Sequence, residues 1–409
     1  MTRIVVRMLV SAACIAAAMM PVTHAAADDK DICNSRAADD QAIAACNRLI
    51  DSGRYQGRDL VTAYLNRGAK WSMKGDHDRA IADYDEMIRL DPKISQAYNN
   101  RGISWRAKGN LDRATADFSQ AIGLDPTLPQ AYQNRATVWR AIGDHDRAIG
   151  DLDRAIALGP DNAEAYNDRG ASWRAKGDMT RAIADLDRAI KLDPKSAKAY
   201  TERGGIWLAK RDNERAFADF DQAIKLNPNL PLAYNGRGVI WSIRGDSDPA
   251  IADFDRAIRL FPRFADAFGN RGYAKFFKGD FDASAADFLK VIEIDPNQYT
   301  LLWRFMARGR VGQNGADELS TASGRLKSKE WPYALIEFYV GRRSLEDTRA
   351  AAKSPGEQCE AAFYIGEWQL LRGNRLEAQE ELRKATADTC PRDFIEYKGA
   401  VAELKRLDR

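Results

Sequence analysis

A 34-residue pattern repeats along most of this chain, and it constrains the fold more than any other feature of the sequence. In the copy that ends at Pro126, an aromatic residue at Tyr98 and a small one at Gly102 are followed by Ala114 and Phe118. A fixed period near this length indicates a stack of helical units, because one unit alone cannot bury its apolar face. Seven copies follow one another without insertion or deletion, and each opens on an aromatic residue: Tyr64, Tyr98, Tyr132, Tyr166, Tyr200, Tyr234 and Phe268.

Each copy carries the pattern of two helices. Apolar and small residues recur about one turn apart from Ala97 to Trp105, and Gly109 then interrupts the run. A second run of the same kind continues from Ala114 and ends at Pro126, because proline cannot continue a helix and restricts the residue before it. The sequence therefore predicts a helix pair in every repeat.

Together these features resemble the tetratricopeptide repeat (TPR). The small residues of that family at helix crossings correspond to Gly102 and Ala114, its aromatic residues to Tyr98 and Phe118, and its proline to Pro126. The resemblance implies an all-α fold, a right-handed superhelical solenoid of antiparallel helix pairs with a helical C-terminal extension.

The predicted organisation places the seven repeats at residues 62–296. Residues 26–61 form a degenerate half-repeat that caps the array. Residues 297–357 form an irregular helical region, and residues 358–409 form a further TPR-like helix pair with a capping helix. Residues 1–25 contain two arginines, no acidic residue and an apolar core, which indicates a secretory signal peptide. A membrane anchor is the alternative, but the apolar run is shorter than the roughly 20 residues that span a bilayer.

The cysteines indicate an oxidising compartment. Cys14 lies inside the apolar run without a leucine-led lipobox, so we expect a soluble exported chain, located in the periplasm and without a lipid anchor. Four cysteines remain after cleavage, an even number, and three pairings are open. We favour Cys33 with Cys46 and Cys359 with Cys390, because the two sets lie at opposite ends of the array. Free thiols or a metal site are the alternatives, and the spacing supports neither.

The tail carries a second resemblance, to the NlpI family of envelope TPR proteins. That family implies an adaptor that binds cell-wall hydrolases and a tail-specific processing protease in the periplasm. Its members are typically lipidated, whereas this chain lacks a leucine-led lipobox. The membrane anchor therefore does not carry over to this chain. The residues of the tail that carry the resemblance are Leu302, Trp303, Trp331, Ile336, Glu337, Phe338, Tyr339, Gly341, Phe363, Tyr364, Gly366, Gly373, Phe394, Ile395, Glu396, Ala402, Glu403 and Leu404.

No catalytic residue, cofactor or metal site is expected. The sequence contains no glycine-rich phosphate loop, no paired zinc-ligand cysteines and no nucleophile motif. His77 and His145 occupy the same turn position in two repeats, where a turn residue is the better interpretation than a metal ligand. Removal of residues 1–25 lowers the formal net charge from +3 to +1. This balance gives no reason to expect a nucleic acid or an anionic membrane surface as partner.

Every copy contains an arginine that is followed sixteen residues later by an aspartate. This pair of positions departs from the general TPR pattern. We expect structural ion pairs between the helices of each repeat, since a bidentate pair of this kind fixes geometry. A charged track for a ligand is the alternative interpretation. The pairs are Arg67 with Asp83, Arg101 with Asp117, Arg135 with Asp151, Arg169 with Asp185, Arg203 with Asp219, Arg237 with Asp253, and Arg271 with Asp287.

A second set of residues is predicted to bind a peptide. In TPR arrays the first helix of each unit lines a concave groove, and asparagine and arginine on that face can bond a peptide backbone and a carboxylate. A solvated helix face is the alternative. The predicted groove residues are Asn66, Asn99, Asn100, Arg106, Asn134, Arg140, Asn167, Arg174, Asn235 and Asn270. Towards the end of the array the same face becomes apolar and is expected to pack against the tail, through Leu208, Val239, Ile243, Tyr273, Phe276 and Phe277.

These features predict a non-catalytic scaffold that binds other envelope proteins or extended peptide segments, in the maintenance of the cell envelope or peptidoglycan. Binding of a glycan or a lipid-linked precursor is the alternative, and it would depend on the aromatic residues of the groove. An enzyme would need a titratable cluster in a pocket, which the sequence does not offer.

Overall fold

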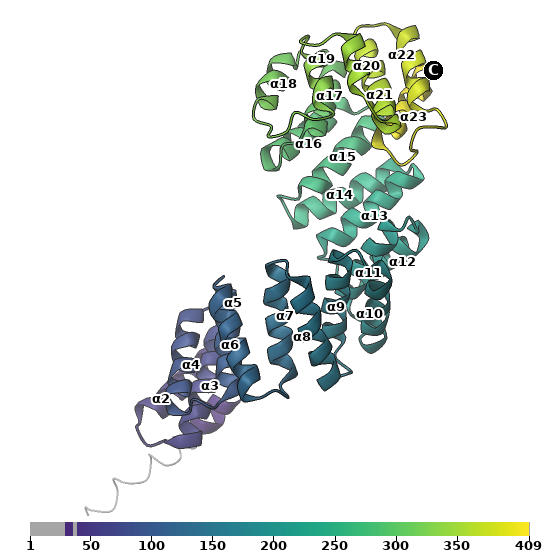
Figure 1. The fold of residues 1–409 in the computed structure, drawn as a ribbon. Coiled ribbons are helices and arrows are strands. Elements are labelled where there is room, and N and C mark those ends of the chain that lie inside the picture. The colour runs from purple at the N-terminus through teal and green to yellow at the C-terminus, as the bar shows by residue number, and fades with distance from the viewer. Residues whose placement is uncertain (1–28, 36–38, 409) are drawn as a thin grey trace, which may run out of the picture. The chain divides into compact units, whose positions relative to one another are not determined.

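The computed structural model describes residues 29–35 and 39–408, and all regular secondary structure in these ranges is helical (Figure 1). The predicted all-α class is therefore confirmed. The chain divides into two compact units, Met1–Pro194 (unit 1) and Lys195–Arg409 (unit 2), each described by itself here. The predicted signal peptide at residues 1–25 lies outside the described residues. Among the helices that are described, none is both long and apolar enough to cross a bilayer.

Unit 1 is a stack of antiparallel helix pairs, one pair for each sequence repeat (Figure 1). Helix α2 precedes the first pair and packs against it, and residues 29–34 are also helical. The helices are α2 (Asp39–Asp51), α3 (Gly57–Met73) with α4 (His77–Leu90), α5 (Ser95–Ala107) with α6 (Leu111–Leu124), α7 (Pro129–Ala141) with α8 (His145–Leu158), and α9 (Ala163–Ala175) with α10 (Met179–Leu192).

A residue with a left-handed backbone and a polar residue define the turn inside each repeat pair; the first is Arg211 between α11 and α12 and a glycine in the other six repeats. Gly109 adopts φ 78°, a left-handed conformation that glycine accepts without a steric penalty. The Asn110 side chain then accepts a hydrogen bond of 3.1 Å from the Arg113 amide, which satisfies one of the free N–H groups at the start of α6. The same cap is made by Asp76, Asp144, Asp178, Asp212 and Asp280.

The two helices of a pair approach closely because the first carries a small residue at the crossing. A Cβ atom built on Gly102 would lie 2.7 Å from the ring of Phe118, which is closer than real side chains come. Phe118 and Ala114 are fully buried beneath this crossing. The repeat thus fills its interior with one aromatic ring, at a site with no room for a larger neighbour.

Unit 2 contains the last three repeats and the tail. The repeat helices are α11 (Ala197–Ala209) with α12 (Asn213–Leu226), α13 (Pro231–Arg244) with α14 (Ser247–Leu260), and α15 (Ala265–Lys278) with α16 (Phe281–Ile294). The tail helices are α17 (Gln298–Arg310), α18 (Ala316–Ser323), α19 (Tyr333–Tyr339), α20 (Leu345–Ala351), α21 (Pro355–Leu371), α22 (Arg375–Ala385) and α23 (Ile395–Leu407).

Trp303 on α17 is the centre of the tail core. It is fully buried, and its ring centroid lies 5.0 Å from that of Tyr273, 4.9 Å from that of Phe276 and 5.2 Å from that of Phe363. These contacts join the last repeat to α17 and α21. The apolar end of the repeat array therefore packs against the tail at Tyr273 and Phe276, as expected, whereas Ile243 keeps 40% of its surface exposed.

Both predicted disulfides are present, Cys33–Cys46 before the first repeat and Cys359–Cys390 in the tail. The second links the start of α21 to the segment after α22, so that it closes this helix pair. All four cysteines are buried. Such bridges persist in oxidising compartments.

Candidate functional site

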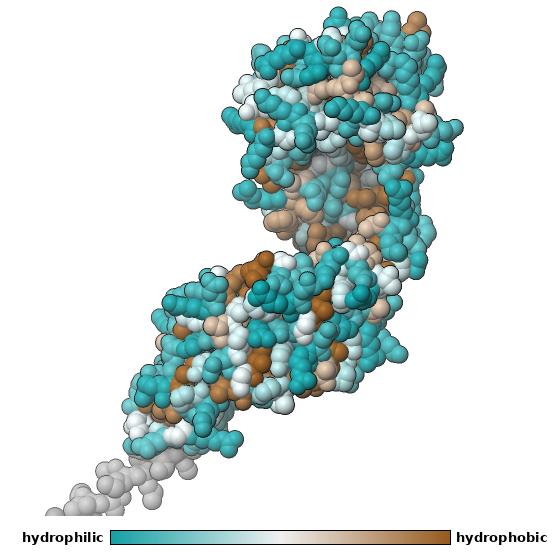
Figure 2. Space-filling model, viewed as in Figure 1, coloured by the Kyte–Doolittle hydropathy of each residue, from teal (hydrophilic) through white to brown (hydrophobic). Residues whose placement is uncertain are grey.

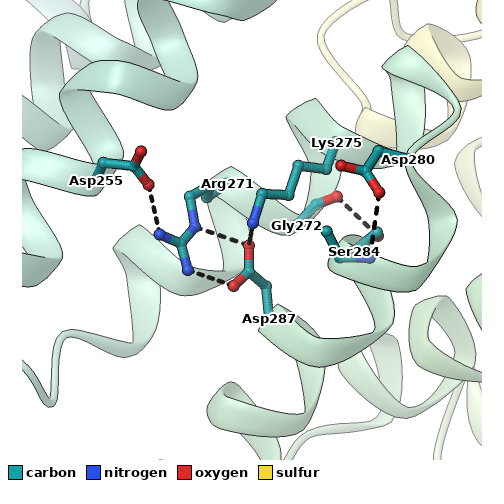
Figure 3. Close-up of polar contacts among 8 residues, drawn as sticks. Asp255, Arg271, Gly272, Lys275, Asp280, Ser284 and Asp287 are labelled. Atoms are coloured by element: carbon teal, nitrogen blue, oxygen red, sulfur yellow. Dashed lines mark hydrogen bonds and ion pairs between the residues drawn. The ribbon is translucent and has the colours of Figure 1, made fainter.

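The repeated arginine and aspartate form a bidentate ion pair inside each repeat. In the second copy, Nε and Nη2 of Arg101 donate to the two carboxylate oxygens of Asp117 at 2.9 and 2.7 Å. Figure 3 shows the corresponding pair of the last copy, in which Arg271 donates to Asp287 at 2.8 and 2.5 Å. The structure brings all seven pairs into contact: Arg67–Asp83, Arg101–Asp117, Arg135–Asp151, Arg169–Asp185, Arg203–Asp219, Arg237–Asp253 and Arg271–Asp287.

The third guanidinium nitrogen reaches the preceding repeat, a contact that the sequence analysis missed. Nη1 of Arg101 donates to Asp85 at 2.5 Å, so this one side chain joins α5 to both α6 and α4. A signal was available, because a second polar residue follows six of the seven paired aspartates at a spacing of two. The partners of this kind are Asp85, Ser119, Asp153, Asp221 and Asp255.

These braces leave little of either charge for a ligand. The Asp117 side chain is 9% exposed and that of Arg101 is 21% exposed. The hydrogen bonds to Asp117 raise the pKa of Arg101 above its ordinary value, because they stabilise the charged form. Since both carboxylate oxygens are occupied, the geometry favours the structural role over a ligand track.

The predicted groove residues lie on the first helix of each repeat, and we call this surface the groove face. In unit 1 its amides bond from one repeat to the next: Nδ2 of Asn134 donates to Oδ1 of Asn99 at 3.0 Å. At the start of the array, Nδ2 of Asn66 donates to Oδ1 of Asn34 at 2.8 Å. Asn34 was not predicted, because it precedes the repeats and has no counterpart in their pattern. These amides thus form two hydrogen-bonded pairs, Asn34 with Asn66 and Asn99 with Asn134.

Two of the predicted asparagines are not open to a ligand. Asn99 is 7% exposed and Asn167 is 2% exposed, because the neighbouring repeat packs over the fifth position of the first helix. Asn66, Asn100 and Asn134 are half-buried and keep accessible surface. The accessible amides of unit 1 are therefore fewer than the sequence pattern predicts.

The three groove-face arginines have different surroundings. Arg140 is 2.7 Å from the carboxylate of Asp168, whose side chain is 6% exposed. Arg106 is half-buried and forms no ion pair with a residue that the structure describes. Burial lowers the pKa of Arg106, and the carboxylates of Asp168 and Glu164 partly oppose this shift. Arg174 lies at the exposed end of α9. Of the three, Arg106 is the desolvated cation that forms no ion pair within the described part of the chain.

In unit 2 the groove face is largely apolar. One amide pair persists, in which Nδ2 of Asn270 donates to Oδ1 of Asn235 at 3.1 Å. Around it, Leu208 and Val239 are half-buried and Ile243 is exposed. Figure 2 shows apolar surface in a hollowed part of this unit, with hydrophilic surface around it.

The strongly perturbed acids belong to the tail core. Burial raises the pKa of Glu396 to about 7, and Oε1 of this residue accepts a hydrogen bond of 2.9 Å from the Tyr364 hydroxyl. Burial also raises the pKa of Glu360, which accepts from Tyr299 at 3.0 Å and from Trp331 at 2.7 Å. Within the described part of the chain, no three His, Cys, Asp or Glu side chains are grouped to hold a metal ion.

A comparison with models of protein families identifies the same repeat that the sequence pattern and the helix pairs indicate. The family model described as tetratricopeptide repeat matches residues 74–129, 135–197, 174–231 and 244–299, about half of the chain. The chain belongs to the tetratricopeptide repeat family. Proteins of this kind are generally non-catalytic and serve in protein–protein interaction. No curated protein matches the chain.

The chain is also similar to solved structures, of which the Cut9–Hcn1 assembly supports the same fold. The Cut9 and Hcn1 hetero-tetramer of the APC/C aligns with 69% of this chain and 55% of its own, at 17% identity and a TM-score of 0.55. MamA aligns over 39% of this chain and 94% of its own, at 27% identity and a TM-score of 0.37. YrrB, described as a TPR protein with an unusual peptide-binding site, aligns over 45% and 95%, at 20% identity and a TM-score of 0.37.

Proposed function

We propose that this TPR protein is a non-catalytic scaffold of the periplasm that holds an extended segment of a partner protein on the groove face of unit 1. The observation that carries the proposal is the row of amides on α3, α5 and α7, with the desolvated Arg106 beside it. A helix face that served only as solvated surface would not be expected to bury half of a cation that forms no ion pair among the described residues.

The amides retain the capacity to bind a peptide backbone. Each asparagine side chain has two N–H donors and an oxygen with two lone pairs. The hydrogen bond from Asn134 to Asn99 uses one donor of the first residue and one lone pair of the second. The remaining groups of the half-buried Asn100 and Asn134 can pair with the N–H and C=O groups of an extended strand, and Arg106 can bond its carboxylates.

The compartment and the pathway form the finer part of the proposal. The two buried disulfides favour an exported protein. The tail residues that resemble the NlpI family, among them Trp303, Tyr364 and Glu396, occupy the core that fixes α23. On this basis the partners are proteins of the cell envelope, such as cell-wall hydrolases or a processing protease.

Affinity capture from a periplasmic extract tests this function, with the intact chain compared with a triple variant, Arg106→Ala, Arg140→Ala and Arg174→Ala. We expect the intact chain to capture a defined set of proteins and the triple variant to lose them. Because loss of Arg140 removes an ion-pair partner of the buried Asp168, Arg106→Ala alone is the second variant, and it should weaken the same captures without a change in melting temperature.

The matched control removes three exposed cations from the second helices of unit 1, Arg89→Ala, Arg154→Ala and Lys191→Ala, for the same change in net charge. It should capture like the intact chain. Equal capture by the intact chain and the triple variant would contradict the use of the groove face. Retention of wall fragments without any protein would contradict the scaffold function and favour a glycan ligand.

A further inference from the structure

A basic pocket in unit 2 lies between the repeats and the last tail helix. It has a volume of about 560 Å³, within the range of roughly 300–1,000 Å³ that is usual for ligand sites. Its walls come from the ends of α13 and α15 and from one side of α23. Five of its thirteen lining residues are cations and none is acidic; the cations are Lys278, Arg392, Lys398, Lys405 and Arg406.

The cations of this pocket differ in how far they are already neutralised. Arg406 is held by Glu403 and donates to the backbone oxygens of Phe276 and Phe277 at 2.7 and 2.6 Å, so it serves the fold. Neither Lys398 nor Lys405 forms an ion pair with any residue in the described part of the chain. Lys398 is also partly buried, and this burial lowers its pKa.

The remaining two cations have exposed partners. Lys278 pairs with Asp248, whose side chain is 81% exposed. Arg392 is 3.3 Å from Asp388, and both side chains are largely exposed. Pairs of this kind contribute little and exchange readily with another carboxylate. The pocket thus presents positive charge that an incoming anion can neutralise.

Part of the pocket lining is apolar, and we call this part its floor. Phe277, Val401 and Ala402 lie between the cations, together with the exposed Ile243. Ser242 also lines the pocket, and its hydroxyl has no hydrogen-bond partner among the described residues. A ligand that fits must therefore carry an apolar group as well as negative charge, which a simple inorganic anion does not.

The wall that carries the lysines is fixed in place before any ligand binds. Glu396 at the start of α23 accepts from the Tyr364 hydroxyl at 2.9 Å, and Glu403 lies 2.9 Å from Arg310. A Cβ on Gly399 would lie 2.7 Å from the Phe363 ring, so the helix is packed closely on the tail core. Little ordering is then needed when the pocket is filled, which favours affinity.

We propose that this pocket binds an acidic segment of a partner protein, with an apolar side chain on the floor and carboxylates on Lys398 and Lys405. The two lysines are seven residues apart on α23, which places them roughly 10 Å apart along one helix face. Two acidic residues three positions apart in an extended chain span about the same distance. The pocket belongs to unit 2, so the proposal stands independently of the groove face of unit 1.

Fluorescence anisotropy with a labelled peptide tests the site on the full chain. The probe is the amidated peptide Ser-Glu-Phe-Ala-Glu-Ser, and its controls replace both glutamates by glutamine or the phenylalanine by alanine. We expect saturable binding of the acidic probe that weakens with salt. Each control peptide should bind at least about tenfold more weakly. Equal binding of the glutamine peptide, or no binding at millimolar concentration, would overturn the proposal.

The variants locate the binding on α23. Lys398→Ala with Lys405→Ala should weaken the acidic probe at least about tenfold, and the exposed Lys405→Ala alone should weaken it measurably without loss of stability. The control Lys191→Ala with Lys290→Ala removes the same charge from exposed positions outside the pocket and should leave binding unchanged. Unchanged binding in both pocket variants would overturn the assignment.

Two further measurements separate this site from other interpretations. Arg106→Ala should bind the probe like the intact chain, so a failure of the groove-face function leaves this result unaffected. Heparin should compete with the probe only through its negative charge. It should therefore displace the acidic probe and the peptide with alanine in place of phenylalanine to the same extent. If heparin displaced the probe from the pocket variant as it does from the intact chain, the probe would be a general polyanion ligand and the proposal would be wrong.

Discussion

Replacement of Arg169 by leucine should destabilise unit 1 by about 2–3 kcal/mol. Nε and Nη2 of Arg169 donate to Asp185 at 2.8 and 2.7 Å, and the Asp185 side chain is 9% exposed. Loss of one partner of a fully buried pair costs about 3–5 kcal/mol, because it leaves an uncompensated charge. The Arg169 side chain is 20% exposed, so water relieves part of this cost. The third contact, to the 57% exposed Asp153, adds less than about 1 kcal/mol.

A double-mutant cycle separates the pair from the loss of the side chains. Arg169→Leu, Asp185→Leu and the double variant are compared with the intact chain by urea denaturation, followed by circular dichroism. The double variant should be more stable than the sum of the two single changes predicts, by about 2 kcal/mol, because neither charge is stranded in it. Repeat arrays can unfold in steps, so the comparison uses the transition that the single variants shift.

The matched control for this cycle is Arg89→Leu, which removes an arginine whose side chain is 66% exposed and which pairs with Glu86 on its own helix. This change should cost no more than about 0.5 kcal/mol. A cost for Arg169→Leu that equals the cost for Arg89→Leu would refute the structural role of the braces. An additive double variant would refute the coupling between Arg169 and Asp185.

Three further predictions concern the stability of the chain. Burial raises the pKa of Glu396 from its ordinary value of 4.5 to about 7, so the folded chain retains a proton that the unfolded chain has lost between these values. The free energy of unfolding should therefore fall by up to about 3 kcal/mol as the pH rises through this window. Glu396→Gln should flatten this pH dependence, measured by urea denaturation at each pH. The same pH dependence in the variant would contradict the shift. Gly150→Ala in the open middle of α8 should raise the free energy of unfolding by about 0.5–1 kcal/mol. Gly102→Ala at the helix crossing should lower it by about 1–3 kcal/mol; the same sign for both in urea denaturation would argue against the crossing contact. Reduction of Cys359–Cys390, which closes a loop with a sequence separation of 31, should lower the stability by about 3–4 kcal/mol. The change in melting temperature with a thiol reductant, compared with that of Cys359→Ser, measures this effect. An unchanged melting temperature would mean that the disulfide adds nothing to stability.

The fold of the repeats could be predicted because the signals are local and recur. The ends of each helix are fixed by a turn residue such as Gly109, a polar cap such as Asn110 and a proline such as Pro126. The 34-residue period repeats these signals in seven copies. The ion pairs could be predicted because both partners change together in every copy. Their third contact, as between Arg101 and Asp85, was missed although the same period contained it.

The site could be predicted less well, because it depends on how closely successive repeats pack. The helical position of Asn99 and Asn167 gives the direction of each side chain from its own helix. It does not show that the next repeat buries them. The pocket in unit 2 had no local signal at all. It forms because Arg406 reaches the backbone of Phe276, a contact between residues 130 positions apart in the chain.

Hydrogen–deuterium exchange tests whether a partner segment lies on the first helices of unit 1. The full chain is measured alone and with a partner protein obtained by capture. The account predicts that the partner slows exchange in α3, α5, α7 and α9 of the intact chain, and that Arg106→Ala removes this protection. Protection confined to the second helices α4, α6, α8 and α10, or unchanged by Arg106→Ala, would contradict the account.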